Sequence, residues 1–247
     1  TELIAIEPEP LTDQGIRTRF HIMLDRRTAR EPFAHIAGKA SFYGLDFISD
    51  ARALVPRPDS EAVVEAALER MPRGRGVQLA DLGTGSGCLL VALLKTRGGA
   101  TGVGIEVDPA AASLAQENLK RHSLTDRAEI KVRDWALWQD WDQMDLIISN
   151  PPYIVSSVIE TLEPEVRSHD PARALDGGAD GLEAYRSLIS VGSARMKAGA
   201  WLVLEIGFDQ RKGVTELMET ADFTDISVTR DLSGHDRVVC GQRPHTE

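Results

Sequence analysis

A glycine-rich turn, Asp81-Leu-Gly-Thr-Gly-Ser-Gly87, stands between an apolar stretch and a helical one. Glycines permit a tight turn and let the backbone approach a ligand closely at the start of a helix. Glu106 ends the next apolar stretch, where an acid typically accepts hydrogen bonds from a ribose diol. A dinucleotide-binding loop would place a third glycine at position 88, which is Cys88 here. The pattern therefore indicates a nucleoside-containing cofactor.

The glycine spacing, Gly-x-Gly-x-Gly, is usual for enzymes that use S-adenosylmethionine, whereas a glycine turn kept only for packing would not need the acid at this distance. Asp134 and Trp135 follow a third apolar stretch, in a loop that faces an adenine in this architecture. We expect Asp134 to accept from the adenine amino group and Trp135 to line the pocket; the alternative is an exposed acid beside a core tryptophan. The candidate cofactor-binding residues are Asp81, Gly83, Thr84, Gly85, Gly87, Glu106, Asp134, Trp135 and Asn150.

The sequence Asn150-Pro-Pro-Tyr153 directly follows a fourth apolar stretch, at the edge of an open sheet where ligands bind. Two consecutive prolines stiffen the turn and keep the Pro151 carbonyl out of a regular ladder. The Asn150 side-chain oxygen and that carbonyl can therefore both accept from one NH2 group, while Tyr153 offers a flat face to a planar group or a cation. The alternative is a loop turn with an asparagine cap. We take Asn150, Pro151 and Tyr153 as candidate catalytic residues for a planar substrate with an exocyclic or amide NH2.

Apolar strands and helices alternate from residue 77 onward. Strands are expected at 77–82, 101–106, 128–132, 144–149, 200–205, 226–228 and 237–240, and helices at 88–94, 108–121 and 182–192. The helix at 108 begins with an Asp-Pro pair that supplies an N-cap and a proline at the first position. Near-continuous apolar strands that alternate with helices indicate a parallel sheet covered on both sides. The predicted fold is α/β, doubly wound.

The first part of the chain has a different pattern. A helix is expected over 16–30, and a short strand with a turn at Gly44 is expected over 41–47. Asp59 is the expected N-cap of a helix that continues to Met71. We therefore divide the chain into an N-terminal helical and hairpin region, residues 1–55, and an α/β domain that holds the cofactor motifs, residues 56–247.

The composition of the chain limits which partners and which cellular compartment we expect. The 247 residues carry a net charge of −10, with no basic stripe for phosphate backbones. Cys88 and Cys240 stand far apart and the six histidines are scattered, so we expect a reducing compartment and no metal site. The chain has no signal peptide pattern and no apolar run long enough to span a bilayer. We expect a cytoplasmic protein without membrane or direct nucleic-acid partners.

Several motifs occur in one order and together resemble the bacterial peptide chain release factor glutamine methyltransferases, a class I S-adenosylmethionine-dependent family. They are Pro56-Arg-Pro-Asp-Ser-Glu61, the glycine turn, Asn150 to Tyr153, Glu163-Pro-Glu-Val-Arg167, Asp170-Pro171, Ala174-Leu-Asp-Gly-Gly178 with Gly181-Leu182, and Glu205-Ile-Gly207. The resemblance covers roughly residues 25–240. It implies a seven-stranded, mostly parallel methyltransferase sheet, and methylation of N5 of the glutamine in the Gly-Gly-Gln loop of class 1 release factors. The implied partner is a release factor, bound by a monomer.

The resemblance also implies a set of substrate-binding residues, namely Pro56, Arg57, Pro58, Asn150, Pro151, Pro152, Tyr153, Glu165 and Arg167. Segment 154–181 is too long for a plain connector. Its Glu165, Arg167 and Asp176 are expected to form a lid or a cradle for the substrate loop, or alternatively a surface ion-pair network.

The sequence departs from the family pattern in three places. The family has an N-terminal helical domain, and the resemblance implies that residues 1–55 are a residual part of it that docks substrate, while residues 56–247 are the methyltransferase domain. Ser60 stands where threonine is usual, and Glu106 stands where aspartate is common. Asn-Pro-Pro-Tyr is shared with adenine-N6 methyltransferases, so a nucleic-acid methyltransferase is the first alternative. A glutamine methyltransferase that acts on a ribosomal protein is the second. A non-catalytic cofactor-binding protein is disfavoured, because it would tolerate a broken motif and this one is intact.

Overall fold

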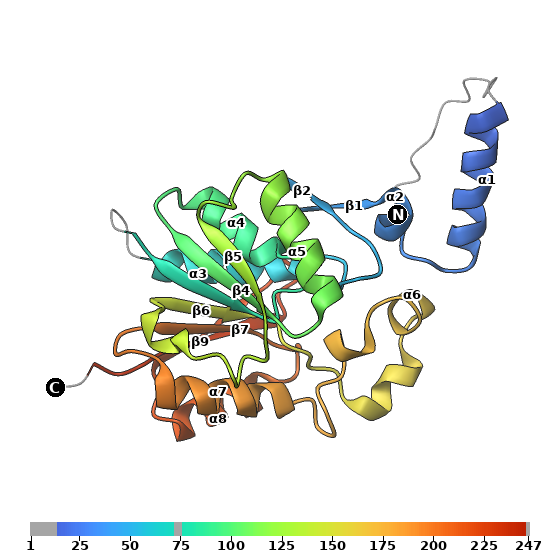
Figure 1. Cartoon of the computed structure of the whole chain (residues 1–247). Helices are drawn as coiled ribbons and strands as arrows, with labels where there is room; N and C mark the ends of the chain where they lie inside the picture. Colours follow the sequence, from blue (N-terminus) through green and yellow to red (C-terminus); the bar gives the residue numbers. More distant parts are fainter. Residues whose placement is uncertain (1–13, 72–75, 246–247) are drawn as a thin grey trace.

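A computed structural model describes residues 14–71 and 76–245, and its centre is one seven-stranded sheet (Figure 1). The strand order is β5-β4-β3-β6-β7-β9-β8. The strands are β3 Gln78–Leu82, β4 Thr101–Glu106, β5 Ala128–Val132, β6 Leu146–Ser149, β7 Trp201–Glu205, β8 Thr224–Arg230 and β9 Asp236–Gln242. The strands β5, β4, β3, β6 and β7 run parallel to one another, and β9 runs antiparallel to both β7 and β8. The predicted α/β, doubly wound, mostly parallel sheet is confirmed.

Helices cover both faces of this sheet, which explains why its strands are apolar on both sides. One face carries α3 Glu61–Arg70, α4 Cys88–Thr96 and α5 Pro109–Arg121, and the other carries α7 Glu183–Arg195 and α8 Arg211–Thr220 (Figure 1). Leu79 points to the first face and packs with Val63 and Leu90. Leu82 points to the second face and packs with Tyr185. No helix in the described residues is long and apolar enough to cross a membrane.

The loops that carry the motifs all leave the carboxyl ends of parallel strands. The helix after β4 begins as predicted, because the Asp108 Oδ1 accepts from the Ala110 N–H at 2.8 Å and Pro109 holds the first helical position. This cap fixes the direction in which the chain leaves Glu106. The ends of β3, β4, β5 and β6 consequently meet along one edge of the sheet, the usual place for a ligand.

The structure differs locally from the sequence predictions at a helix cap, a strand and a helix. Asp59 is not the N-cap of α3, because Pro58–Ser60 forms a 3₁₀ turn and the α-helix begins at Glu61, with Ser60 as its cap residue. The hairpin expected in the N-terminal region, with its turn at Gly44, is present. The short strand expected over 41–47 is two strands, β1 Lys39–Phe42 and β2 Leu45–Ile48, with Tyr43 and Gly44 at positive φ in the turn. Helix α8 was not predicted. Most side chains of α8 are charged or polar, and Val214 and Met218 are its only buried residues.

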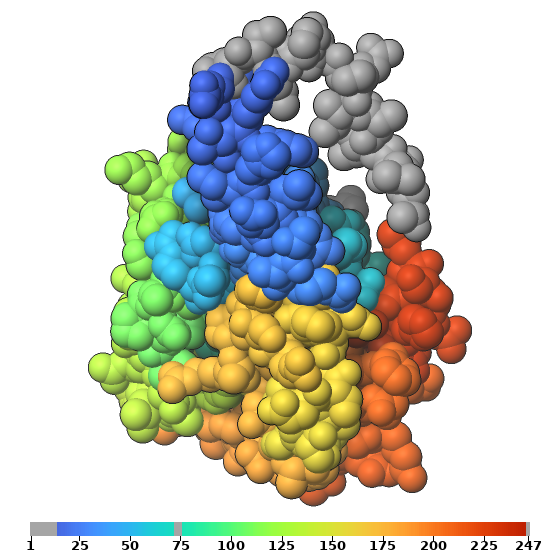
Figure 2. Space-filling view, turned by 90° about the vertical axis from the view of Figure 1, so that its right-hand side faces the viewer, coloured from blue at the N-terminus to red at the C-terminus, as the bar shows by residue number. Residues whose placement is uncertain are grey.

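The N-terminal segment packs against the long segment that follows β6. It consists of α1 Gln14–Thr28, α2 Phe33–Ala37 and the hairpin, and Figure 2 shows it above the segment that contains the 3₁₀ turn Ser156–Thr161, α6 Pro164–Arg167 and the 3₁₀ turn Ala172–Ala174. Ion pairs join the two, from Arg27 to Glu165 at 3.0 Å and from Arg30 to Glu163 at 2.9 Å. The predicted division at residue 55 stays a prediction.

Candidate active site

A cavity of about 450 Å³ opens at the carboxyl ends of the parallel strands. Its wall includes ten of the residues that the sequence predicted for the site: Pro56, Arg57, Gly83, Thr84, Gly85, Glu106, Asp134, Trp135, Asn150 and Pro152. These residues come from the loops after β3, β4, β5 and β6 and from the segment before α3. The structure therefore brings the glycine turn and the Asn-Pro-Pro-Tyr motif to one cavity.

The glycine turn lies over β4 and is held there by backbone bonds. Gly83 and Gly85 have φ angles of 70° and 54°, which favour glycine. The Gly83 N–H donates to the Ile105 carbonyl at 2.8 Å, and the Thr84 hydroxyl donates to the Asp81 Oδ2 at 2.6 Å. Asp81 is fully buried beneath the turn, and burial raises its pKa to about 7. Asp81 thus supports the turn from below and is not part of the cavity wall.

Glu106 is a buried acid that joins two of the loops around the cavity. Its Oε2 accepts from the Gly85 N–H at 2.9 Å, and its Oε1 accepts from the Asp108 N–H at 3.0 Å. These bonds fix the position of the carboxylate. Each carboxylate oxygen can accept a second hydrogen bond, so Glu106 retains acceptor capacity toward the cavity that it lines.

Trp135 and Asp134 form the wall on the β5 side. The indole N–H of Trp135 donates to the Ser187 hydroxyl at 3.1 Å, which fixes the ring. A Cβ on Gly83 would lie 3.5 Å from this ring, so the indole packs directly beside the glycine turn. Asp134 is exposed and its Oδ1 accepts from the Ala136 N–H at 2.8 Å. The pair provides a flat apolar surface with an acid next to it.

Asn150 lines the cavity where the chain leaves β6, and hydrogen bonds hold its motif in place. The Asn150 Nδ2 donates to the Ser60 hydroxyl oxygen at 3.2 Å. The Tyr153 hydroxyl donates to the Glu205 Oε1 at 3.3 Å, and the Gln210 Nε2 donates to the Tyr153 carbonyl at 2.9 Å. The motif is therefore anchored to the residue before α3, to the end of β7 and to the residue before α8.

Seven predicted site residues lie outside the cavity wall: Asp81, Gly87, Pro58, Pro151, Tyr153, Glu165 and Arg167. Pro151 is buried next to Asn150, and the Tyr153 hydroxyl reaches away to Glu205. Glu165 pairs with Arg27 and Arg30, and Arg167 donates to the Glu160 carbonyl at 2.7 Å. The roles predicted for these residues stay predictions.

The cavity wall also contains residues that the sequence did not predict. They include 52–55 from the segment after β2, and Pro171, Arg173 and Ala174 from the segment after β6. These two stretches are joined by an ion pair of 2.8 Å between Arg57 and the buried Asp170. Burial raises the pKa of Asp170, although the Arg57 guanidinium opposes that shift. The two partners belong to the motifs Pro56-Arg-Pro-Asp59 and Asp170-Pro171, which are the pattern in the sequence that could have indicated this contact.

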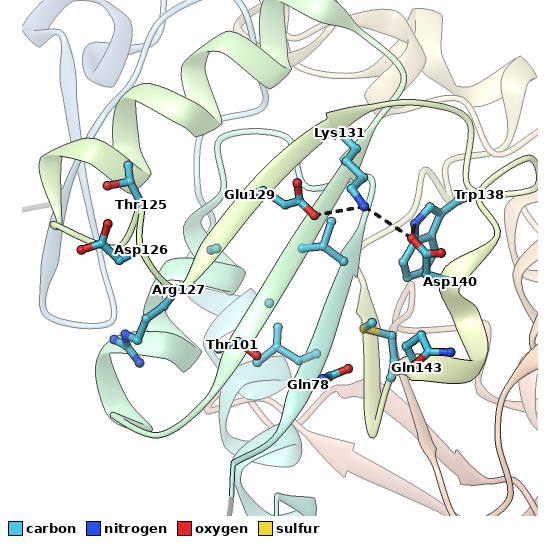
Figure 3. Close-up of a pocket in the computed structure, with 15 residues that line it drawn as sticks. Gln78, Thr101, Thr125, Asp126, Arg127, Glu129, Lys131, Trp138, Asp140 and Gln143 are labelled. Atoms are coloured by element: carbon cyan, nitrogen blue, oxygen red, sulfur yellow. Dashed lines mark hydrogen bonds and ion pairs between the residues drawn. The ribbon is translucent and has the colours of Figure 1, made fainter.

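A second cavity lies toward the other edge of the sheet, beside β3, β4 and β5 (Figure 3). Lys131 points between Glu129 and Asp140, at 3.0 and 3.4 Å from their carboxylates. Arg127 donates to several main-chain carbonyls, including that of Leu94 at 2.8 Å. Four of the charged side chains in its lining, Arg127, Glu129, Lys131 and Asp140, are thus engaged with one another or with the backbone. None of the predicted site residues lines this cavity. No cluster of His, Cys, Asp or Glu within 14–71 and 76–245 has the arrangement of a metal site.

Comparison with known proteins identifies the family. Residues 61–163 match the family model described as the methyltransferase small domain. The release factor glutamine methyltransferase of Caulobacter vibrioides is 41% identical over 98% of this chain and 83% of its own length. The chain belongs to the release factor glutamine methyltransferase family.

Further similarities agree with this assignment. The release factor glutamine methyltransferase of Rhodospirillum rubrum is 43% identical over 90% of this chain and 67% of its own length. The crystal structure of the hMettl16 catalytic domain in complex with MAT2A 3'UTR hairpin 6 superposes with a TM-score of 0.68 at 17% identity, over 83% of this chain and 77% of that one. At that identity the superposition shows a shared fold only.

Proposed function

We propose that this protein transfers a methyl group from S-adenosylmethionine to the side-chain amide nitrogen of the glutamine in the Gly-Gly-Gln loop of class 1 peptide release factors. The observation that carries the proposal is that Asn150 lines the same cavity as the glycine turn and Glu106. A nucleoside site and an acceptor for an amide NH2 are therefore adjacent. The relatives named as release factor glutamine methyltransferases support the choice of substrate.

The residues of the cavity fit S-adenosylmethionine. Glu106 keeps acceptor capacity for ribose hydroxyls, the Trp135 ring offers a flat surface for an adenine, and the positive φ of Gly85 lets the backbone come close. When bound, the cofactor supplies an electrophilic methyl group on a cationic sulfur. The acidic balance of residues 101–180, with 15 acids against 7 bases, favours a cationic ligand.

The chemistry expected of the protein at the acceptor is orientation. An amide nitrogen is a poor nucleophile because its lone pair is delocalised into the carbonyl group. Two acceptors, the Asn150 oxygen and the Pro151 carbonyl, would bind its two hydrogens and direct the lone pair toward the methyl group. Orientation in ideal intramolecular reactions contributes up to about 7–11 kcal/mol. A strong general base is not required, because the methylated, cationic amide is very acidic and loses its proton late.

The segments around the cavity mouth are proposed to receive the release factor. Arg57 and Pro56 line the cavity from the segment before α3, while Glu165 joins α6 to the N-terminal segment through Arg27. This arrangement supports substrate docking by residues 1–55 and by segment 154–181. Action as a monomer is part of the same proposal. A cytoplasmic location follows from the substrate, because release factors act on ribosomes.

The test is incubation of the purified protein with a class 1 release factor and labelled S-adenosylmethionine, followed by peptide mass mapping. We expect one methyl group on the glutamine of the Gly-Gly-Gln loop. A release factor with glutamate at that position should receive none, because a carboxylate has no NH2 for Asn150 and is repelled by the same acceptors. Label in adenine-containing oligonucleotides but not in the release factor would indicate a nucleic-acid methyltransferase. Label in a ribosomal protein alone would show that the substrate is a ribosomal protein and not a release factor.

A further inference from the structure

The side-chain amide of Asn150 must present its oxygen, and not its NH2, to an acceptor amide. The two ends of an asparagine amide have nearly the same shape, so the surrounding hydrogen bonds decide which end faces the cavity. The Nδ2 of Asn150 donates to the hydroxyl oxygen of Ser60, which is 3% exposed. The question is then what makes Ser60 an acceptor at this position.

Glu205, at the end of β7, supplies the answer. It is 2% exposed, and the Ser60 hydroxyl lies close enough to its carboxyl group to lower its pKa. The Tyr153 hydroxyl donates to Oε1, whereas Oε2 is buried without a hydrogen bond of normal geometry from the described residues. A buried carboxylate therefore stands beside Ser60 with unused acceptor capacity, and such groups strongly favour a donor.

A serine hydroxyl has one proton and an ionised carboxylate only accepts. The Ser60 proton therefore goes to Glu205, and the Ser60 oxygen is left to accept from the Asn150 Nδ2. The Asn150 oxygen then faces the cavity. We propose that Ser60 and Glu205 are positioning residues that fix the orientation of the Asn150 amide for methyl transfer. This inference rests on the proposed function, and it gives two buried residues, one just before α3 and one at the end of β7, a defined part in the reaction.

The arrangement depends on the ionisation of Glu205. Burial raises its pKa to about 7, while the interaction with Ser60, the charge of Arg237 and the interaction with Tyr153 oppose that shift. The groups that face it are Ser60, Asp59, Cys88, Tyr153, Tyr185 and Arg237. Burial raises the pKa of Cys88 to about 12 and also raises the pKa of Tyr153, so neither group loses its proton near pH 7.

Protonated Glu205 can itself donate to Ser60, which releases the Ser60 proton toward Asn150 and favours the opposite amide orientation. Turnover should therefore rise with pH as Glu205 loses its proton. Burial gives Asp81 a pKa of about 7 as well. The informative quantity is consequently the difference between the pH profiles of the wild type and Glu205→Gln, in which Asp81 is unchanged.

The experiment compares Ser60→Ala, Ser60→Thr, Glu205→Gln and a matched control, Ser227→Ala. Ser227 also accepts from a nitrogen donor, Arg70 at 2.6 Å, but lies on β8 away from the cavity. We expect Ser60→Ala to lower kcat for release factor methylation on the order of 100-fold, a usual effect of losing one preorganised hydrogen-bonding group. Cofactor Kd should not change. Ser60→Thr keeps the hydroxyl and should retain most of the wild-type kcat, as should Ser227→Ala.

Glu205→Gln should lower kcat and lose the rise of kcat around pH 7. Wild-type kcat in Ser60→Ala, or an equal loss in Ser60→Thr, would overturn the inference while leaving the proposed function intact. So would a pH profile of Glu205→Gln identical to that of the wild type. If Glu205→Gln does not fold, the two Ser60 variants still decide. A wild-type protein that methylates no release factor would overturn both the proposed function and the inference.

Discussion

The two sides of the cavity are built in different ways. The side proposed to hold the cofactor, here the cofactor side, consists of loops within residues 83–89, 106–111 and 134–135. The side proposed to hold the substrate amide, here the acceptor side, consists of residues within 52–60, 150–152 and 171–174. Backbone bonds between neighbouring strands hold the first side, such as that from Gly83 to Ile105. Contacts between residues far apart in the sequence hold the second, such as the pair of Arg57 and Asp170.

Because the two sides are held by different contacts, we expect that cofactor binding and substrate methylation can be altered separately. The cofactor side forms whenever the parallel sheet forms, because its loops begin where β3, β4 and β5 end. The acceptor side also requires the segments before α3 and after β6 to dock together. Changes on the cofactor side should therefore alter cofactor affinity, and changes on the acceptor side should alter turnover or the use of the release factor.

Asn150→Ala should have the largest effect. It removes an acceptor for the substrate NH2, so we expect methyl transfer to fall on the order of 100- to 1000-fold. Cofactor affinity should change little, because the glycine turn and Glu106 lie on the other side of the cavity. Isothermal titration beside an activity assay measures both quantities. The matched control is Gln143→Ala, which removes an exposed amide that lines the second cavity. Comparable losses of affinity and turnover would erase the division between the two sides.

Glu106→Ala should come next and should act on affinity. If Glu106 accepts from the ribose hydroxyls, its loss costs about 1.5–3 kcal/mol of cofactor binding, or about 10- to 150-fold in Kd. It also leaves the Gly85 N–H without its partner. Asp126→Ala, which removes an acid from the wall of the second cavity, is the control and should leave Kd unchanged. An unaltered Kd for Glu106→Ala would place the ribose elsewhere.

The fold could be predicted from sequence wherever local patterns agree with the tertiary structure. The expected strands at 101–106 and 128–132 match β4 and β5, because their apolar runs are bounded by clear turns. The predicted N-cap of α3 was wrong because two prolines favour a short 3₁₀ turn before the helix. Residue propensities alone do not predict the length of such a turn. Helix α8 was missed because it buries so few apolar side chains.

The same distinction, between local patterns and tertiary packing, applies to the residues of the site. The places of Gly83, Glu106 and Trp135 in the cavity wall could be predicted because each lies at or shortly after the end of a strand. Arg173 could not, because its place in the wall depends on how a long irregular segment folds back toward the cavity. The contact of Ser60 with Asn150 spans 90 positions and has no local pattern. Such contacts depend on tertiary packing that periodicity and motif spacing do not describe.

Glu165→Gln should have the smallest effect and tests the outer part of the acceptor side. The Glu165 carboxylate accepts from Arg27 at 3.0 Å and from the Arg30 Nε at 2.8 Å, but both arginines are about half exposed, at 46% and 49%. Exposed ion pairs contribute little and are screened by salt. We expect KM for the release factor to rise about two- to fivefold, with kcat and cofactor Kd unchanged.

The salt dependence of this effect distinguishes docking from catalysis. The rise in KM of Glu165→Gln should disappear at about 0.5 M salt, where exposed charges are strongly screened. Glu160→Gln is the matched control, because Glu160 lies in the same segment and its side chain makes no ion pair among the described residues. A fall in kcat as large as that of Asn150→Ala would show that α6 takes a direct part in methyl transfer. The acceptor side would then extend beyond the cavity wall, to the contact between α6 and α1.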